Sequence, residues 1–327
     1  MVGMKYVLLG VAVCLSCTSR VGELPAVVYA PVTLSVGGWE VPPGMSPPRC
    51  IVVRLGNEKP AFVTSVRSRL GVSGHHVTLL RTDATQEQLE PVECVGFGDV
   101  LGGGTQPLTI SQVPDDTVAL PLGVGFLLPA HAMVKVEAHF LNEGRAPVTA
   151  EASVTIQWSD VPADAVPAAM GFYGIGQLEV PVGEWSSPWE FVPLTPGMRV
   201  FGVSAHTHGM ATTVEIEHAP GADAPGMPLY PGETPFDYRA PAVAHFNPVH
   251  EVHEGEGLRY RCTWNNTTGK ALGFGEEMCV LWAYEFPAES YRVCMHVGDL
   301  LSCCPGDGCD SLGPLLMQPD ADDAPPS

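Results

Sequence analysis

Residues 134–140 have the sequence VKVEAHF, and residues 149–158 have the sequence TAEASVTIQW. Apolar and polar side chains alternate along both stretches, as expected of strands with one face against a core. Pro, Gly, Asn and Asp clusters separate these stretches from further β-branched or alternating runs. The sequence therefore predicts an all-β protein of antiparallel sandwiches or barrels. The further runs are residues 27–36, 50–54, 76–80, 199–205, 212–218 and 277–286.

The composition agrees with many short elements joined by turns. The chain has 327 residues, including 36 Gly and 32 Pro, which a protein of long helices does not carry. This length favours two domains. The 36 acidic residues outnumber the 16 Lys and Arg residues, giving a net charge of −20. That charge excludes a basic surface for nucleic acid as the default, so we expect no nucleic-acid partner.

A linker-like stretch sets the predicted domain boundary. Residues 159–169, SDVPADAVPAA, hold two prolines and two aspartates, which suits an interdomain connection. The predicted domains are residues 26–161 and residues 162–312. Residues 313–327 are rich in Pro and Asp and are predicted to be disordered.

The N-terminal segment has the layout of an export signal. Residues 1–19, MVGMKYVLLGVAVCLSCTS, place Lys5 before an apolar run and small residues after it. The end of the run resembles a bacterial lipoprotein box with Cys17 as the lipidated residue, and ordinary secretion and an uncleaved anchor are the alternatives. All three place the mature protein in an oxidising compartment, at the cell envelope or outside the cell. We expect a lipid-anchored bacterial protein whose membrane contact is that anchor.

Three histidine motifs accompany the predicted strands. Residues i and i+2 of a strand point to one face, so His206 and His208 can reach one ion. Adjacent residues face opposite ways, so His75 and His76 need a strand end or a bulge to share a metal. A third motif is His139, late in its run. A lone buried histidine is more often a hydrogen-bonded core residue than a ligand, so these motifs alone indicate a metal protein and no more.

A later segment makes the metal hypothesis more specific. Cys262 and Cys279 flank a polar loop, which suggests a hairpin closed by a disulfide. Met278 precedes the second cysteine, and a thioether combined with two imidazoles favours copper, above all Cu(I), over zinc or magnesium. The alternative for Met278 is an ordinary core methionine.

Taken in order, these motifs resemble the copper type II ascorbate-dependent monooxygenases, the family that includes peptidylglycine α-hydroxylating monooxygenase and dopamine β-hydroxylase. The resemblance extends to CIVVRL at residues 50–55 and GVGF at residues 123–126, and covers about residues 32–286. It implies two tandem antiparallel β-sandwich domains, jelly-roll-like, with one copper in each and solvent between them.

The resemblance also implies a ligand set and a reaction. Ascorbate or a similar donor reduces two copper ions, dioxygen binds at the Met-containing copper, and a substrate C–H bond is hydroxylated with a second electron from the other copper. The implied ligands are His75, His76 and His139 for the electron-transfer copper, and His206, His208 and Met278 for the catalytic copper. The implied disulfides are Cys50–Cys94 and Cys262–Cys279.

The chain departs from the peptide-amidating branch of that family. Ser204 replaces an Arg and Val280 replaces an Asn, and neither can hold a carboxylate as an Arg fork does. Glu137 replaces a Gln near the third histidine. Peptidylglycine is therefore not expected as a substrate. Trp282 would add an apolar wall, which favours a small neutral or apolar molecule.

Two further groups carry weaker predictions. Cys294, Cys303, Cys304 and Cys309 allow three connectivities, and we expect two disulfides there in preference to a third metal site. The remaining histidine cluster lies in a polar, Pro-containing stretch and is predicted to be on the surface; its members are His245, His250 and His253.

The leading functional hypothesis is a copper-dependent C–H hydroxylase. The alternative is a non-catalytic copper-binding or copper-handling lipoprotein of the envelope on the same scaffold. A structural or adhesive β protein leaves the six-ligand set unexplained, and Met278 as a ligand argues against a zinc hydrolase. Product formation that depends on ascorbate and dioxygen separates the first two.

Overall fold

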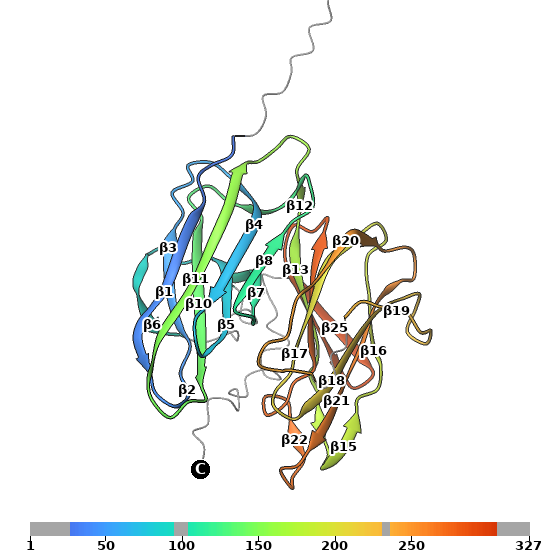
Figure 1. The fold of residues 1–327 in the computed structure, drawn as a ribbon. Helices are drawn as coiled ribbons and strands as arrows, with labels where there is room; N and C mark the ends of the chain where they lie inside the picture. Colours follow the sequence, from blue (N-terminus) through green and yellow to red (C-terminus); the bar gives the residue numbers. More distant parts are fainter. Residues whose placement is uncertain (1–26, 95–103, 231–235, 306–327) are drawn as a thin grey trace, which may run out of the picture.

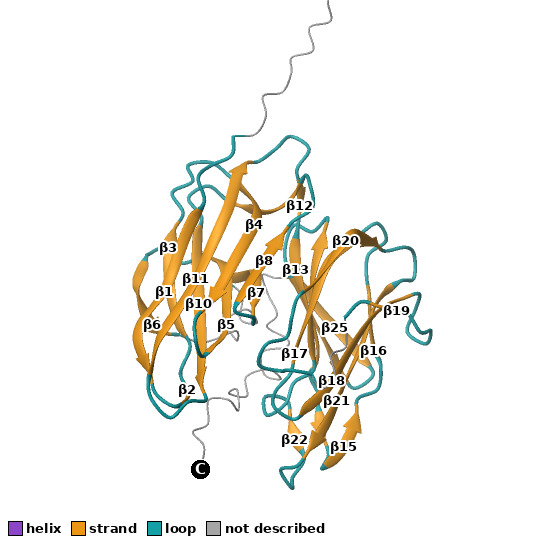
Figure 2. Cartoon of the chain, in the orientation of Figure 1, coloured by secondary structure: helices purple, strands orange, loops and turns teal. Residues whose placement is uncertain are grey.

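The computed structural model describes residues 27–94, 104–230 and 236–305 (Figure 1). Cys17 with the predicted signal, Cys309 and the predicted tail lie outside them. Every regular element of the described chain is a strand, as Figure 2 shows, and the described residues hold no helix that could cross a membrane. The prediction of an all-β protein is confirmed.

Two six-stranded sheets form the first half of the described chain, residues 27–167. Their strands are β1 Val32–Val41, β2 Gly44–Met45, β3 Arg49–Arg54, β4 Ala61–Leu70, β5 Gly74–Thr82, β6 Gln88–Glu93, β7 Thr105–Ser111, β8 Asp115–Ala119, β9 Val124–Leu128, β10 Met133–Asn142, β11 Val148–Asp160 and β12 Val166–Pro167. One sheet has the order β1-β11-β4-β9-β12 with β8 on β4, and the other has the order β6-β3-β10-β5-β7 with β2 on β10.

The second half, residues 169–305, holds three sheets. Their strands are β13 Ala169–Ile175, β14 Glu179–Val180, β15 Gly183–Ser186, β16 Glu190–Pro193, β17 Arg199–His206, β18 Ala211–Ala219, β19 Met227–Pro228, β20 Ala244–Glu251, β21 Gly257–Asn266, β22 Leu272–Gly273, β23 Val280–Phe286, β24 Arg292–Val297 and β25 Leu300–Pro305. The main sheet has the order β20-β17-β23-β13-β24-β25; a second has β15-β21-β18-β19 with β16 on β21, and β14 pairs β22.

The predicted runs all overlap strands, with two displaced ends. β1 begins at Val32, because the residues before it contribute only an isolated bridge at Val28. β23 begins at Val280, because Glu277 to Cys279 lie in a loop that the Cys262–Cys279 disulfide ties to β21.

All described strand pairings stay within one half or the other. β12 lies beyond the predicted boundary at residues 161–162, yet it pairs in parallel with β9 and so extends the first half to Pro167. The two predicted domains and their exact limits stay a prediction.

The two sheets of the first half pack on the apolar side chains of their alternating strands. Register places Val134, Val136 and Ala138 of β10 on the same face as Val77 and Leu79 of β5, and all five are buried. The alternation in residues 134–140 therefore predicted this face correctly.

The opposite face of the same strands carries polar residues, and it is buried too. Lys135, Glu137 and His139 of β10 and Thr78 and His76 of β5 are each less than a tenth exposed. Strand alternation alone leads us to expect this face in water. The second half of the chain contacts the adjoining strand β7 and the turn after it.

Direct hydrogen bonds join the two halves beside this polar face. Gln112 Nε2 donates to the Ala205 carbonyl at 3.2 Å, and Ile110 N–H donates to the Tyr284 hydroxyl at 3.4 Å. The solvent layer that the resemblance implies between the halves is thus absent at these described residues. The physical reason is that the buried polar groups of β7 and the following turn find their partners on β17 and β23.

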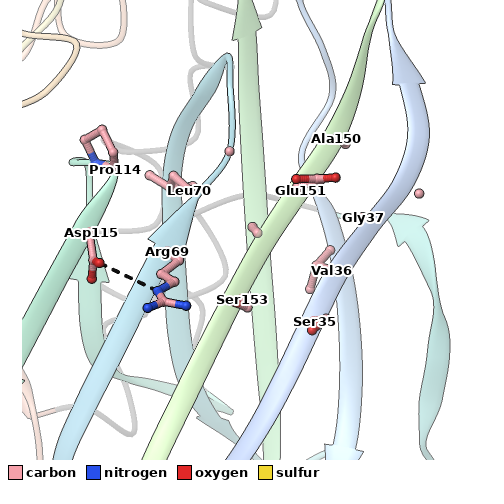
Figure 3. Close-up of a pocket in the computed structure, with 13 residues that line it drawn as sticks. Ser35, Val36, Gly37, Arg69, Leu70, Pro114, Asp115, Ala150, Glu151 and Ser153 are labelled. Atoms are coloured by element: carbon pink, nitrogen blue, oxygen red, sulfur yellow. Dashed lines mark ion pairs between the residues drawn. The ribbon is translucent and has the colours of Figure 1, made fainter.

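A surface depression lies over β1, β4 and β11 (Figure 3). Arg69 and Asp115, whose Nε and Oδ2 atoms are 3.6 Å apart, form one side of it. None of the histidines lines it, and β1, β4 and β11 belong to the sheet opposite β5 and β10. The depression is therefore separate from the histidine motifs.

A buried charge network stabilises the second half. Arg292 Nη2 lies 3.2 Å from Glu285 Oε2, Arg292 Nε donates to the Tyr173 hydroxyl at 2.8 Å, and Tyr173 donates to Glu285. Burial raises the pKa of Glu285, and the guanidinium of Arg292 opposes that rise. Each charge in this network depends on the other for its compensation.

We predict that Glu285→Ala lowers the free energy of unfolding by about 3 kcal/mol, because it leaves the Arg292 guanidinium without its counter-charge in a mostly buried site. Urea denaturation measures the change. Arg67→Ala is the control, since its ion pair with Asp115 is exposed and contributes little. Equal, small effects of the two substitutions would show that the buried network is not stabilising.

Candidate metal centre

A β-bulge brings the adjacent histidines to one side of the β5–β10 ladder. Register pairs His76 with His139 and Gly74 with Phe140, so His75 is the additional residue on β5. A bulge re-aims the side chain of its extra residue. The condition that the sequence sets for His75 and His76 to share a metal is thereby met.

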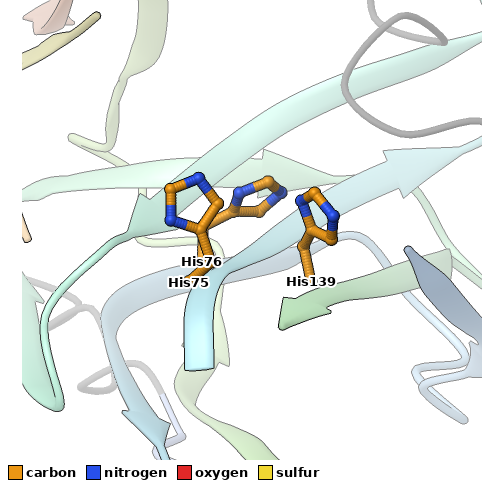
Figure 4. A group of neighbouring side chains, drawn as sticks. All are labelled: His75, His76 and His139. Atoms are coloured by element: carbon orange, nitrogen blue, oxygen red, sulfur yellow. The ribbon is translucent and has the colours of Figure 1, made fainter. Parts of the chain in front are cut away.

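The rings of His75, His76 and His139 converge (Figure 4). Their centroids are 5.1 to 5.5 Å apart, and one ligand nitrogen from each ring lies within 4.8 Å of the other two. Three buried ring nitrogens have no hydrogen-bond partner: His75 Nδ1, His76 Nδ1 and His139 Nε2. Buried polar atoms are normally satisfied, so three such atoms in one cluster fit the donor set of a bound metal.

Two of these rings, His75 and His139, are held in the neutral form that binds metals. Burial, followed by the neighbouring His76, His139 and His208, lowers the pKa of His75 to about 2. Burial and His76 lower the pKa of His139 to about 3, against a rise from a hydrogen bond with the Ser46 backbone. An unprotonated imidazole has a lone pair for a metal at neutral pH.

Glu137 is a buried carboxylate beside the three rings. Its Oε1 lies 3.1 Å from His76 Nε2, on the opposite side of the ring from the unpartnered Nδ1. A carboxylate that accepts from a ligand histidine fixes the orientation of the ring and makes it a stronger donor. Glu137, the residue that replaces a Gln of the peptide-amidating branch, therefore contacts one of the three histidines.

His206 and His208 form the second histidine group. His206 ends β17, His208 lies in the turn to β18, and their ring centroids are 5.3 Å apart. Burial lowers the pKa of His206 well below its usual range, followed by the charges of His208, His75, His76 and His139. The two histidine groups therefore interact electrostatically across the two halves.

The loop before β23 is fastened to this turn by Glu276 and Glu277. The Glu276 carbonyl lies 3.1 Å from His208 Nδ1, and Glu277 Oε2 accepts from His208 N–H at 3.1 Å. Glu277 Oε1 accepts from Met210 N–H at 2.7 Å, and Trp264 Nε1 donates to Oε2 at 3.0 Å. One buried carboxylate thus holds both sides of the His208 turn.

Met278 follows Glu277 in the same loop. It is half-buried and packs against the hydrophobic core. The contacts of its two preceding residues bring the backbone of this loop beside His208. Ligation by the Met278 sulfur stays a prediction.

The described chain contains three disulfides with both partners described. Cys50–Cys94 and Cys262–Cys279 are the pairs that the resemblance implies, and the second fixes the loop that carries Met278. Cys294 bonds to Cys303, which selects among the connectivities left open by the sequence. Cys304 is disulfide-bonded as well.

The face of the second-half sheet that carries His206 is apolar around it. Register puts Ser204 opposite Trp282 and His206 opposite Val280 on neighbouring strands. The Trp282 ring is 6.1 Å from His206 and 5.3 Å from Phe172, centroid to centroid. Ser204 Oγ donates to the Ala242 carbonyl at 3.1 Å, so this hydroxyl is already engaged.

The other histidines lie apart from these two groups. His245 and His253 are exposed and His250 is half-exposed, in agreement with a surface cluster. His250 contacts Phe246 and His218, and His218 Nε2 lies 3.1 Å from Glu256. His296 is buried between Tyr260 and the Phe191 carbonyl.

Two residues of the site escaped the sequence analysis. Glu277 could have been noted as the acidic neighbour of Met278, but its three hydrogen bonds depend on the folded loop. Gln112 contacts His206 from the other half, Oε1 to Nδ1 at 3.0 Å. No motif or spacing in the sequence marks Gln112.

Comparison with protein families gives a match within the second half. Residues 190–302 match the family model described as copper type II ascorbate-dependent monooxygenase, C-terminal domain. The matched range contains His206, His208, Met278 and the Cys262–Cys279 pair. The resemblance predicted from the sequence is confirmed by this match. No curated protein matches the chain.

Several solved structures are similar to the chain at low identity. The major capsid protein P2 of bacteriophage PM2 is 9% identical with a TM-score of 0.34, covering 79% of this chain and 97% of its own. A recombinant peptide:N-glycanase F is 9% identical with a TM-score of 0.30, covering 83% of this chain and 98% of its own. The ANX2 ectodomain from Arabidopsis thaliana is 7% identical with a TM-score of 0.25, covering 82% and 92%. These scores are too low to bear on function.

We predict that the metal-free protein loses stability as the pH falls below about 6.5. His75 and His139 have folded pKa values of about 2 and about 3, against 6.5 when unfolded. The unfolded chain therefore binds more protons in this range, and each such histidine lowers the free energy of unfolding by up to about 1.4 kcal/mol per pH unit.

Urea denaturation of the metal-free protein from about pH 7.5 to about pH 5 measures this slope. His139→Leu should reduce it by the contribution of one histidine. An unchanged slope in that variant would mean that His139 is not buried in its neutral form.

Proposed function

We propose that this protein is a copper-dependent monooxygenase that hydroxylates a C–H bond of a small substrate with dioxygen and an ascorbate-type reductant. One observation carries the proposal: three buried ring nitrogens without partners lie in electrostatic reach of a second histidine group, and the segment around that group matches the monooxygenase family model. We also propose, from the signal-like N-terminus, that a lipid on Cys17 holds the protein at the cell envelope.

The two donor sets suit two copper ions. Three imidazoles from His75, His76 and His139 provide nitrogen donors, whereas His206 and His208 with the Met278 thioether provide a softer set that favours Cu(I). Bound copper would supply one-electron redox chemistry and activation of dioxygen.

The chain's own residues keep the second set ready for a metal. The carbonyl of Glu276 can only accept, so His208 Nδ1 carries a proton toward it and Nε2 is the ring's donor atom. Glu277 holds the backbone of the same turn through His208 and Met210. Such fixed second partners keep a ligand ring at one orientation.

The surroundings of His206 favour a neutral or apolar substrate. Trp282 lies beside its ring, and the Ser204 hydroxyl is engaged by Ala242. An Arg fork, the group that would hold a peptide carboxylate, is replaced by Ser204. We therefore propose a small molecule without a carboxylate at its reacting end as the substrate.

A substrate screen tests the proposed activity. The copper-loaded protein is incubated with ascorbate, dioxygen and neutral or apolar small molecules, and mass spectrometry detects singly oxygenated products. Reactions without ascorbate, without dioxygen and with His208→Ala are the controls. Copper binding without any oxygenated product would favour the non-catalytic copper-binding lipoprotein.

We predict that the protein binds two copper ions per chain. His139→Ala and His208→Ala should each reduce the content to about one, because each removes a ligand from a different set. Metal analysis after copper loading and removal of excess metal gives the count. One copper in the wild type, or tight zinc in both sites, would contradict two separate copper sites.

We predict that Met278 ligates copper through sulfur. X-ray absorption of the Cu(I) form should show a sulfur scatterer in the wild type that is absent in Met278→His. The variant should still bind copper but lose hydroxylation, because an imidazole nitrogen is a harder and stronger donor than a thioether. Met295, which is fully buried, offers the matched control Met295→Leu. Identical spectra for wild type and Met278→His would remove Met278 from the site.

A further inference from the structure

Gln112 is a buried amide placed between the two histidine groups. It lies one residue beyond β7, is only 3% exposed, and belongs to the first half of the chain. Both ends of its amide contact the second half, at Ala205 and His206 of β17. Because both partners of the Gln112 amide lie in the second half of the chain, only the tertiary structure positions this side chain.

The two contacts determine which way the amide points. A backbone carbonyl only accepts, so the atom 3.2 Å from the Ala205 oxygen is Nε2. The atom 3.0 Å from His206 Nδ1 is therefore Oε1. The opposite orientation would place two acceptor oxygens against each other.

The orientation of Gln112 fixes the proton of His206. An amide oxygen only accepts, so His206 Nδ1 must donate to it. A neutral imidazole with its proton on Nδ1 has its lone pair on Nε2. His208 has the same arrangement through the Glu276 carbonyl, so both rings have Nε2 as the donor atom for a shared ion.

Gln112 also connects this ring to the other histidine group. Ser111, the preceding residue, pairs with Val77 of β5, and Val77 directly follows His76. The route from His76 to His206 thus consists of two covalent steps, one strand pair and one side chain. A hydrogen bond at its end restricts how far the two groups can separate.

We propose that Gln112 is a positioning residue that selects the Nδ1–H tautomer of His206 from the opposite half of the molecule. It thereby orients Nε2 toward the ion and couples the placement of the two histidine groups. The metal-binding consequence rests on the proposed function, whereas the tautomer itself is a property of the metal-free protein.

The tautomer is measured in the metal-free full-length chain. Long-range proton–nitrogen NMR of ¹⁵N-histidine-labelled protein distinguishes Nδ1–H from Nε2–H, with His206→Asn assigning the signals. We expect wild-type His206 to carry its proton on Nδ1. A proton on Nε2 in the wild type would overturn the proposal without any substitution.

Two variants separate the hydrogen bond from the packing. Gln112→Leu removes the acceptor, so the Nε2–H tautomer of His206 should become populated and the affinity for one of two copper ions should fall by about 10- to 100-fold. Gln112→Glu keeps an acceptor toward Nδ1 and should retain the Nδ1–H tautomer even if its contact with Ala205 is lost. Gln157→Leu is the matched control, because Gln157 also donates to a backbone carbonyl, that of Tyr29, on an exposed part of β11.

The outcomes distinguish this proposal from the proposed enzyme activity. An Nδ1–H tautomer and unchanged copper affinity in Gln112→Leu would show that Gln112 is only a packing residue. Nε2–H in Gln112→Glu would also contradict the role of its acceptor. A monooxygenase assay without product would leave the tautomer result intact, since that measurement needs neither copper nor substrate.

Discussion

His76, His139 and Glu137 lie on the face of the β5–β10 ladder that points away from the apolar core, and this face is nevertheless buried. Burying polar groups is costly unless they find partners. Several buried atoms here have no hydrogen-bond partner, among them His75 Nδ1, His76 Nδ1, His139 Nε2 and Glu137 Oε2. The three histidine nitrogens without hydrogen-bond partners are the strongest structural argument for a metal.

The same burial determines the electrostatics of both histidine groups. Desolvation is the largest cause of the low pKa values of His75, His139 and His206, and each ring also responds to its neighbours. Neutral imidazoles are ready to bind a metal without first releasing a proton. The cost is a fold that is weakened by acid while the metal is absent.

Covalent and hydrogen-bonded ties hold the second group from several directions. The Cys262–Cys279 disulfide fixes the loop before β23, Glu277 fastens that loop to the His208 turn, and Gln112 reaches His206 from the first half. Side chains held in this way have little freedom to adjust, so the protein would largely set the geometry of a metal bound there. Trp282 and the engaged Ser204 hydroxyl leave the adjoining sheet face suited to apolar contacts.

Local patterns in the sequence determined the strands and the candidate ligands. Alternation in residues 134–140 predicted β10 and its core face. The His-x-His spacing and Met278 beside Cys279 indicated the family that residues 190–302 match. Tertiary structure alone decided the bulge at His75, the burial of the polar face and the contact of Gln112 with His206. The reason is that a two-residue period records which face a side chain is on. The contacts of Gln112 with Ala205 and His206 join residues 93 and 94 positions apart, and no local pattern encodes such a pairing.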